Sequence, residues 1–289
     1  MSVTDLDWVA IALRTTVYVG SIAAAGGILF AATVNGAAVV RAAIRTQVWV
    51  GVALLMLVEP LRYAQFQLAI SGGDWSLAFD PTMRWMAFET PIGHAAALRI
   101  GASILILIGG LRWWPVSLAG AGVMIGSFAF EGHTASHSPA NWTALAAPVL
   151  LLAHSATVHW WLGALVPLRA ATAPNIDHER RAQLVAQFGT IATWTAALLV
   201  TAGAVLIALL SGFQLDLDRN HQLVLALKLF VFAAVLALAA TNKLRWTPML
   251  RTAPEAGRHG LRRSLNLEIG VCGAILVATA VMISFSPAP

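Results

Sequence analysis

The chain has 289 residues, of which 58% are hydrophobic and only 11% are charged, and its mean hydropathy is +0.76. This composition excludes a soluble globular domain and is typical of a polytopic membrane protein. The single cysteine, Cys272, excludes a disulfide framework and a thiolate metal cluster.

Long apolar runs predict an all-α, polytopic integral membrane helix bundle. Hydropathy indicates about eight transmembrane helices, each near the ~20 residues that cross a hydrocarbon core, over approximately residues 8–34, 46–70, 94–112, 115–136, 143–168, 184–212, 221–244 and 264–285. The first run is too long for the apolar part of a signal peptide, so we expect it to be retained. We expect one membrane domain over 1–289, in which 184–285 completes the C-terminal four-span half and packs on 8–168.

Basic residues are distributed unequally between the two sides of this predicted bundle. One side holds twelve lysines and arginines in its loops, whereas the other side, with both termini, holds only Arg84 and Arg219. Cytoplasmic loops of membrane proteins carry an excess of Lys and Arg. The distribution therefore places both termini on the outer side, and it explains the net charge of +5 without a nucleic-acid partner.

Four of the eight histidines lie between residues 128 and 167. A coordinating side chain is costly within a bilayer and by default indicates function. His133 and His137 are four residues apart, so a continuing helix would present them on one face, where they could share an ion. His154 lies near the middle of its span, and His159 lies about 7–8 Å deeper at ~1.5 Å per residue. These two are about 140° apart around a helix, so both cannot face one site.

His94 opens the third span on the outer side, where His133 and His137 close the fourth. Imidazole suits copper, zinc and iron, and thioethers in the outer loop 71–93 would select Cu(I). The predicted metal ligands are His94, His133, His137, His154 and His159, with Met83 and Met86 as auxiliary ligands. Each also has a plainer interpretation, because interfacial methionines and core histidines commonly serve packing and hydrogen bonding.

A second set of polar residues is expected to hold the helices together. Glu59 and Arg62 are three apart on one span and can pair, which lowers the cost of charge in lipid. Glu268, Asn242 and Lys243 share a cytoplasmic depth and are expected to hold the last two helices together, whereas Lys228 lies too near the outer side to join them. We interpret these polar residues as structural. The absence of a Walker loop, a nucleophile elbow and an H-E-x-x-H motif predicts that the chain is no enzyme, unless bound haem gives it redox activity.

Short segments in a fixed order resemble one membrane family. They are ETPIGHAAALR at 89–99, EGHTA at 131–135, HSATVHWWLGAL at 154–165, Lys228 with Leu229, Asn242, and LRRSLNLE at 261–268. With these segments spread over most of its length, the chain resembles CopD, the copper resistance protein of the inner membrane, which is related to the membrane part of YcnJ-type copper importers. The order of the segments on eight spans gives the resemblance its specificity.

The resemblance implies a protein of the bacterial inner membrane, with periplasmic termini, that takes up copper or transfers it from the periplasm toward the cytoplasm as Cu(I) or Cu(II). A separate CopC-like periplasmic copper chaperone would be a partner, beside the lipid bilayer. Two alternatives stay open from the residues themselves. Histidines on neighbouring helices also hold haem b, so His133 or His94 facing His154 would make a redox protein. The same imidazoles could instead sense periplasmic acidification.

Overall fold

Helices make up all the regular structure in the residues that the computed structural model describes, which are 7–131, 142–211 and 220–285. Within these ranges, seven helices are long and apolar enough to cross a membrane: Trp8–Thr33, Asn35–Ile70, Pro91–Gly109, Ala146–Ala171, His178–Ala208, Leu223–Thr252 and Pro254–Ser284. The all-α class is confirmed. The fourth of the eight expected spans corresponds to a shorter apolar helix, Trp114–Phe130, which ends in a 3₁₀ turn. Residues 132–136 of that expected span lie outside the described residues.

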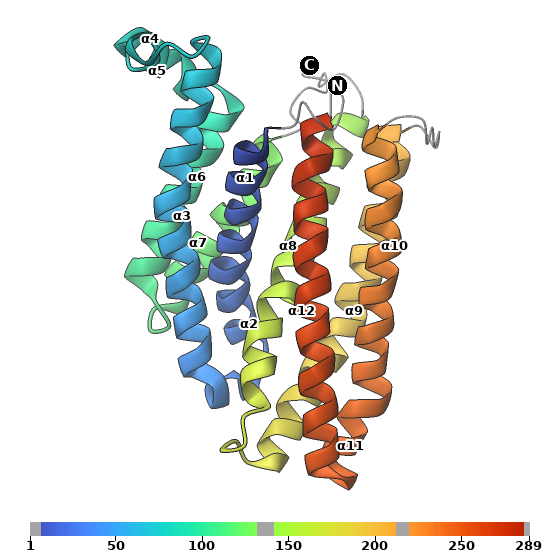
Figure 1. Cartoon of the computed structure of the whole chain (residues 1–289). Helices are drawn as coiled ribbons and strands as arrows, with labels where there is room; N and C mark the ends of the chain where they lie inside the picture. Colours follow the sequence, from blue (N-terminus) through green and yellow to red (C-terminus); the bar gives the residue numbers. More distant parts are fainter. Residues whose placement is uncertain (1–6, 132–141, 212–219, 286–289) are drawn as a thin grey trace.

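The N-terminal part of the chain forms one side of the bundle (Figure 1). Its first span contains a π-helical turn, η2, between two α-helices, and its second span follows a 3₁₀ turn, η3. The elements are α1 (Trp8–Ser21), η2 (Ile22–Gly26), α2 (Gly27–Thr33), η3 (Asn35–Val40), α3 (Arg41–Ile70), α6 (Pro91–Gly109), α7 (Trp114–Gly126) and the 3₁₀ turn η4 (Ser127–Phe130).

The remaining helices form the other side, and the last of them closes the bundle against the first. They are α8 (Trp142–Ala171), α9 (His178–Ser211), α10 (Asn220–Thr241), a second π-helical turn η6 (Asn242–Trp246), α11 (Thr247–Thr252) and α12 (Pro254–Phe285). Helix α8 contacts elements of both sides, namely η2, α2, α9 and α12, while α12 also packs on α1. Side chains of α8 can therefore reach the first span, α9 and α12.

Local sequence signals set the start and end of α6, which carries two of the residues of interest. The Thr90 hydroxyl accepts a hydrogen bond from the Gly93 amide at 3.2 Å, and Pro91 occupies the first helical position. The helix ends at Gly110, whose φ of 53° is readily adopted only by glycine. These signals place His94 in the first turn of α6 and Arg99 in its third.

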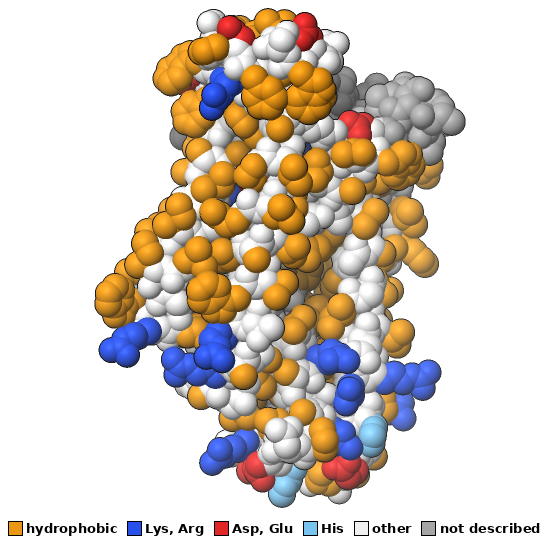
Figure 2. Space-filling view, turned by 60° about the vertical axis from the view of Figure 1, so that its left-hand side comes forward, with side chains coloured by type: hydrophobic (Ala, Val, Ile, Leu, Met, Phe, Trp, Pro, Cys, Tyr) orange, Lys and Arg blue, Asp and Glu red, His pale blue; other side chains and the backbone are white. Residues whose placement is uncertain are grey.

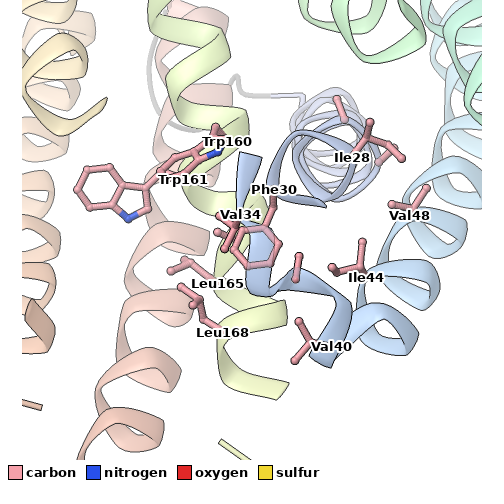
Figure 3. Packing of buried hydrophobic residues seen from close by; sticks show 14 of the residues in the cluster. Ile28, Phe30, Val34, Val40, Ile44, Val48, Trp160, Trp161, Leu165 and Leu168 are labelled. Atoms are coloured by element: carbon pink, nitrogen blue, oxygen red, sulfur yellow. The ribbon is translucent and has the colours of Figure 1, made fainter. Parts of the chain in front are cut away.

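The apolar core lies where the first span, α3 and α8 meet (Figure 3). Phe30, Ile44, Val48, Trp160 and Leu165 are all buried there. Close packing extends to the backbones, because a Cβ atom added to Gly26 of η2 would lie 2.1 Å from the His159 carbonyl oxygen of α8. Glycine is thus required at this crossing, as is common where membrane helices approach closely.

The two ends of the molecule differ in charge and shape. Two short helices, α4 (Trp75–Ala78) and α5 (Pro81–Phe88), stand beyond one end of α3 and α6 (Figure 1), and the start of α1 and the end of α12 lie toward that same end. On the face shown in Figure 2, lysine and arginine side chains gather toward the opposite end, where α11 lies. The loops that are rich in lysine and arginine in the sequence thus lie together at one end of the molecule.

Candidate functional site

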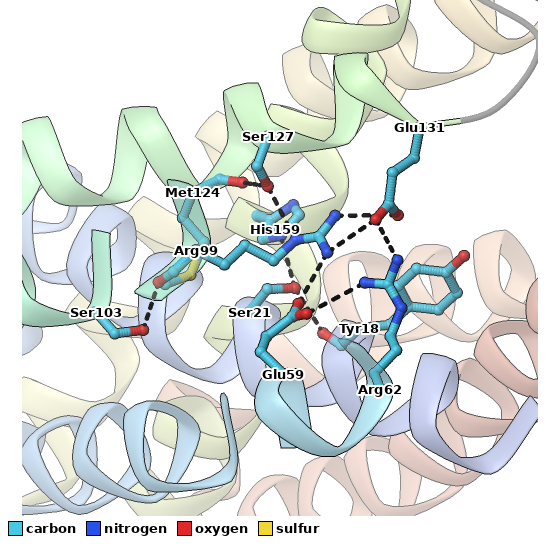
Figure 4. Close-up of polar contacts among 10 residues, drawn as sticks. All are labelled: Tyr18, Ser21, Glu59, Arg62, Arg99, Ser103, Met124, Ser127, Glu131 and His159. Carbon is cyan, nitrogen blue, oxygen red and sulfur yellow. Dashed lines mark hydrogen bonds and ion pairs between the residues drawn. The ribbon is translucent and has the colours of Figure 1, made fainter. Parts of the chain in front are cut away.

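A buried cluster of two arginines and two glutamates ties α3, α6 and the end of η4 together (Figure 4). Arg99 is 0% exposed, and its Nη1 donates to Glu59 Oε1 at 2.8 Å and to Glu131 Oε1 at 3.1 Å. Arg62 Nη1 donates to Glu59 Oε2 at 3.2 Å, and Arg62 Nη2 also contacts Glu131. The four formal charges cancel, which lowers the cost of burying each of them.

The surroundings of the Arg99 side chain complete its coordination. Its Nε donates to Ser127 Oγ at 2.9 Å, and its guanidinium lies 4.5 Å from the centre of the Phe128 ring. At the rim of the cluster, burial acts to raise the pKa of Glu131, but the charges of Arg99 and Arg62 outweigh it and lower that pKa to about 2. The four side chains are paired with one another, so we interpret the cluster as a structural element that joins these helices.

The expected contact between Glu59 and Arg62 is present, but sequence reasoning missed their two other partners. Arg99 and Glu131 entered the sequence analysis only as parts of the short segments 89–99 and 131–135. Their contacts join residues 40 and 32 positions apart, so no helical spacing rule could have found them. The sequence did offer one indication, because an arginine within an apolar span requires an acidic partner on another helix.

His159 is a fully bonded core residue. Its Nδ1 lies 2.7 Å from the Ser155 carbonyl oxygen, and its Nε2 lies 3.2 Å from the Ser21 hydroxyl at the start of η2. The ring also packs against Phe128, with centroids 5.5 Å apart. Both ring nitrogens are thus engaged with protein groups, which leaves no lone pair for a metal ion without breaking one of these bonds.

His154 differs from His159 in this respect. It lies half-buried on another face of α8, beside Gly203 of α9, as the five-residue separation predicted. Its Nδ1 is buried and makes no close hydrogen bond among the residues described, although the Leu199 backbone of α9 lies within hydrogen-bonding reach of the ring. Buried polar atoms are nearly always paired, so the His154 ring is held less firmly by protein groups than the His159 ring.

The other predicted ligands lie near the end of the bundle that carries α4 and α5. His94 is half-buried in the first turn of α6, and its ring packs edge-on against Phe88, with centroids 5.6 Å apart. On α5, Met83 is half-buried and Met86 is 56% exposed. His133 and His137 lie outside the described residues. Within the described ranges, no three His, Cys, Asp or Glu side chains converge on a metal-binding position.

A second polar site lies on the opposite side of α8, toward the basic end. Glu268 of α12 is 2% exposed, and its two oxygens accept hydrogen bonds from Trp161 Nε1 and Asn242 Nδ2, each at 3.0 Å. The expected meeting of Glu268 and Asn242 is therefore present. Sequence reasoning did not foresee Trp161, and Lys243 turns instead to the Thr193 hydroxyl. Lys228 is half-buried on α10, apart from this site.

Two comparisons by family model match the chain. A model described as copper resistance protein D-like, N-terminal domain, matches residues 5–143, and a model described as copper resistance protein D matches residues 182–282. The searches of curated proteins and of solved structures gave no match. The first matched segment contains the arginine–glutamate cluster and His94, and the second contains Lys228, Asn242 and Glu268.

Proposed function

Because the chain belongs to the copper resistance protein D (CopD) family, we propose that it moves copper across the bacterial inner membrane, from the periplasm toward the cytoplasm. This proposal rests on the match of the N-terminal and C-terminal segments of the chain to two models of one copper resistance family. The described part of the chain also contains seven candidate membrane spans. Copper is here the transported substrate, as Cu(I) or Cu(II).

The distribution of lysine and arginine supports one orientation of the bundle in the membrane. The basic end in Figure 2 would face the cytoplasm. The opposite end, with both termini, α4 and α5, would then face the periplasm. In this orientation His94, Met83 and Met86 meet copper first, and a CopC-like chaperone would dock at the same end.

The state of each imidazole supports different roles for the histidines. His94, with His133 and His137, would bind copper at the periplasmic end, and Met83 and Met86 would assist as soft ligands. His154 would be the next copper-binding residue, since its Nδ1 makes no close hydrogen bond among the described residues. His159, with both nitrogens bonded, would hold α8 against the first span rather than bind the ion.

Copper uptake by proteoliposomes tests this assignment. Replacing His154 by alanine should slow uptake by at least about tenfold, the scale on which disrupting a metal site acts. His178→Ala is the matched control, because that side chain is 61% exposed at the basic end. Wild-type uptake by the His154→Ala protein would contradict the proposed role of His154.

A further inference from the structure

Two buried glutamates in this bundle differ in the charge of the groups that hydrogen-bond to them. Glu59 is 0% exposed and receives hydrogen bonds from Arg99 at 2.8 Å and Arg62 at 3.2 Å. Glu268 is equally buried at 2% exposed, but both of its partners, Trp161 and Asn242, are neutral. In the described part of the chain, no lysine or arginine nitrogen lies within 4.0 Å of Glu268.

The charged groups described on the surrounding elements are bonded elsewhere or lie apart from Glu268. On α8, Arg169 donates to Asn266 of α12 at 2.6 Å. On η6, Lys243 donates to Thr193 of α9. On α1, Arg14 donates to the Ala280 carbonyl and to Ser284, more than three turns away along α12. On α10, Lys228 precedes Asn242 by fourteen residues, about 21 Å along a helix. The nearest titratable group on α12 itself is Cys272, one turn further on, which bears no positive charge.

Asn242 is suited to serve both protonation states of this carboxyl group. Its Nδ2 donates to Glu268 Oε2, as an ionised carboxylate requires, while its Oδ1 is buried without a partner among the described residues. Rotation of the amide by 180° would instead present the carbonyl oxygen to a protonated Oε2–H. The Trp161 N–H donates to Oε1 in either state. An uncompensated buried charge is costly, and the surroundings of Glu268 supply hydrogen bonds but no opposite charge.

Glu268 also has access to space in which water can sit. With Asn242, Lys243 and Thr193 it forms the polar part of an otherwise mainly apolar, partly open cavity of about 240 Å³ between α8, α9, α10, η6, α11 and α12. The cavity is far larger than one water molecule requires, and these polar groups offer hydrogen-bond partners. Arg263, at the basic end, lies five residues from Glu268, about 7–8 Å along α12. A proton could thus pass between the cavity and the carboxyl group.

We propose that Glu268 is a proton-binding site, which takes one proton from water in the cavity and returns it there in each cycle of copper movement. In the first step the Oε2–H bond forms as hydronium becomes water, and in the second step the same bond breaks and hydronium is restored. Asn242 turns its amide to match each state. The coupling to copper rests on the proposed function, whereas the proton site itself does not.

Infrared difference spectroscopy of the reconstituted protein tests the proton site without copper. Between about pH 5 and pH 9, the wild-type protein should lose one carbonyl stretching band of a protonated carboxyl group. Glu268→Gln should remove this band and keep both hydrogen bonds. Asn242→Ala should shift the band, because it removes the amide. Glu179→Gln, at an exposed carboxyl group on α9, should leave it unchanged.

A second variant and a transport assay make the outcomes distinguishable. Glu268→Asp should move the band but keep its response to pH, which protects the test if the glutamine variant does not fold. In proteoliposomes, copper uptake by the wild type should change with the pH of the solution that reaches the cavity, and uptake by Glu268→Gln should respond less. A pH-responsive band that Glu268→Gln and Glu268→Asp both leave untouched overturns the proton site. A band that behaves as described in a protein that moves no copper refutes the proposed function alone.

Discussion

At the residue scale, Glu131 shows how charge is tolerated at the rim of this bundle. Its side chain is 19% exposed and contacts both Arg62 and Arg99. These two charges, acting against burial, lower its pKa from the ordinary value of 4.5 to about 2. Because the folded pKa is the lower one, the ion pairs stabilise the fold fully above about pH 4.5, and this stabilisation is lost as the pH falls toward 2.

Replacing Glu131 by glutamine should therefore lower thermal stability in detergent near neutral pH. The expected loss is roughly 3 kcal/mol at most, at about 1.4 kcal/mol per pKa unit. The difference from wild type should shrink when unfolding is measured at about pH 3. Glu89→Gln, at an exposed carboxyl group on the same end of the bundle, is the control. A difference that stays constant with pH would refute the ion-pair account of Glu131.

The sequence predicted contacts within one helix at this scale better than contacts between helices. Glu59 and Arg62 followed from their spacing, and Glu268 with Asn242 followed from their depth. Arg99 and Trp161 could not be assigned partners, because the rotation of one helix against another is not encoded in hydropathy. For the same reason the sequence could not distinguish the bonded His159 from the less firmly held His154.

At the scale of elements, the crossing of η2 and α8 depends on two glycines. A Cβ atom on Gly163 would lie 2.4 Å from Gly26 Cα, and one on Gly26 would lie 2.1 Å from the His159 carbonyl oxygen. The π-helical turn brings Ser21 and Gly26 against α8 at this point. Hydropathy placed a helix here but could not reveal the turn, because averaging over a span hides a local change in helical pitch.

Gly26→Ala should destabilise the protein by about 1–3 kcal/mol, the usual cost of overpacking, because backbone atoms must move apart. It should also disturb the His159–Ser21 hydrogen bond. Thermal unfolding in detergent measures the effect, and Gly122→Ala is the matched control, since a Cβ atom on Gly122 of α7 meets nothing within 4 Å. Equal stability of the two variants would show that the crossing is not tightly packed.

At the scale of the whole molecule, the basic asymmetry fixes the proposed orientation. Reporter domains fused after Arg45 or Arg181 should be cytoplasmic, and fusions after Asp80 should be periplasmic. Alkaline phosphatase is active only when its fusion point is periplasmic, whereas a green fluorescent protein is fluorescent when its fusion point is cytoplasmic. A cytoplasmic reporter after Asp80 would invert the orientation and place His94 at the wrong end for copper arriving from the periplasm.

The central claim, that this bundle handles copper with its imidazoles, is tested most directly by metal content and visible spectrum on one purified sample. We predict that the protein retains copper, shows no Soret band, and loses copper when His94 and His154 are both replaced by alanine, while His178→Ala retains it. A Soret band on a protein without copper would contradict the account and identify haem b as the group held by these histidines.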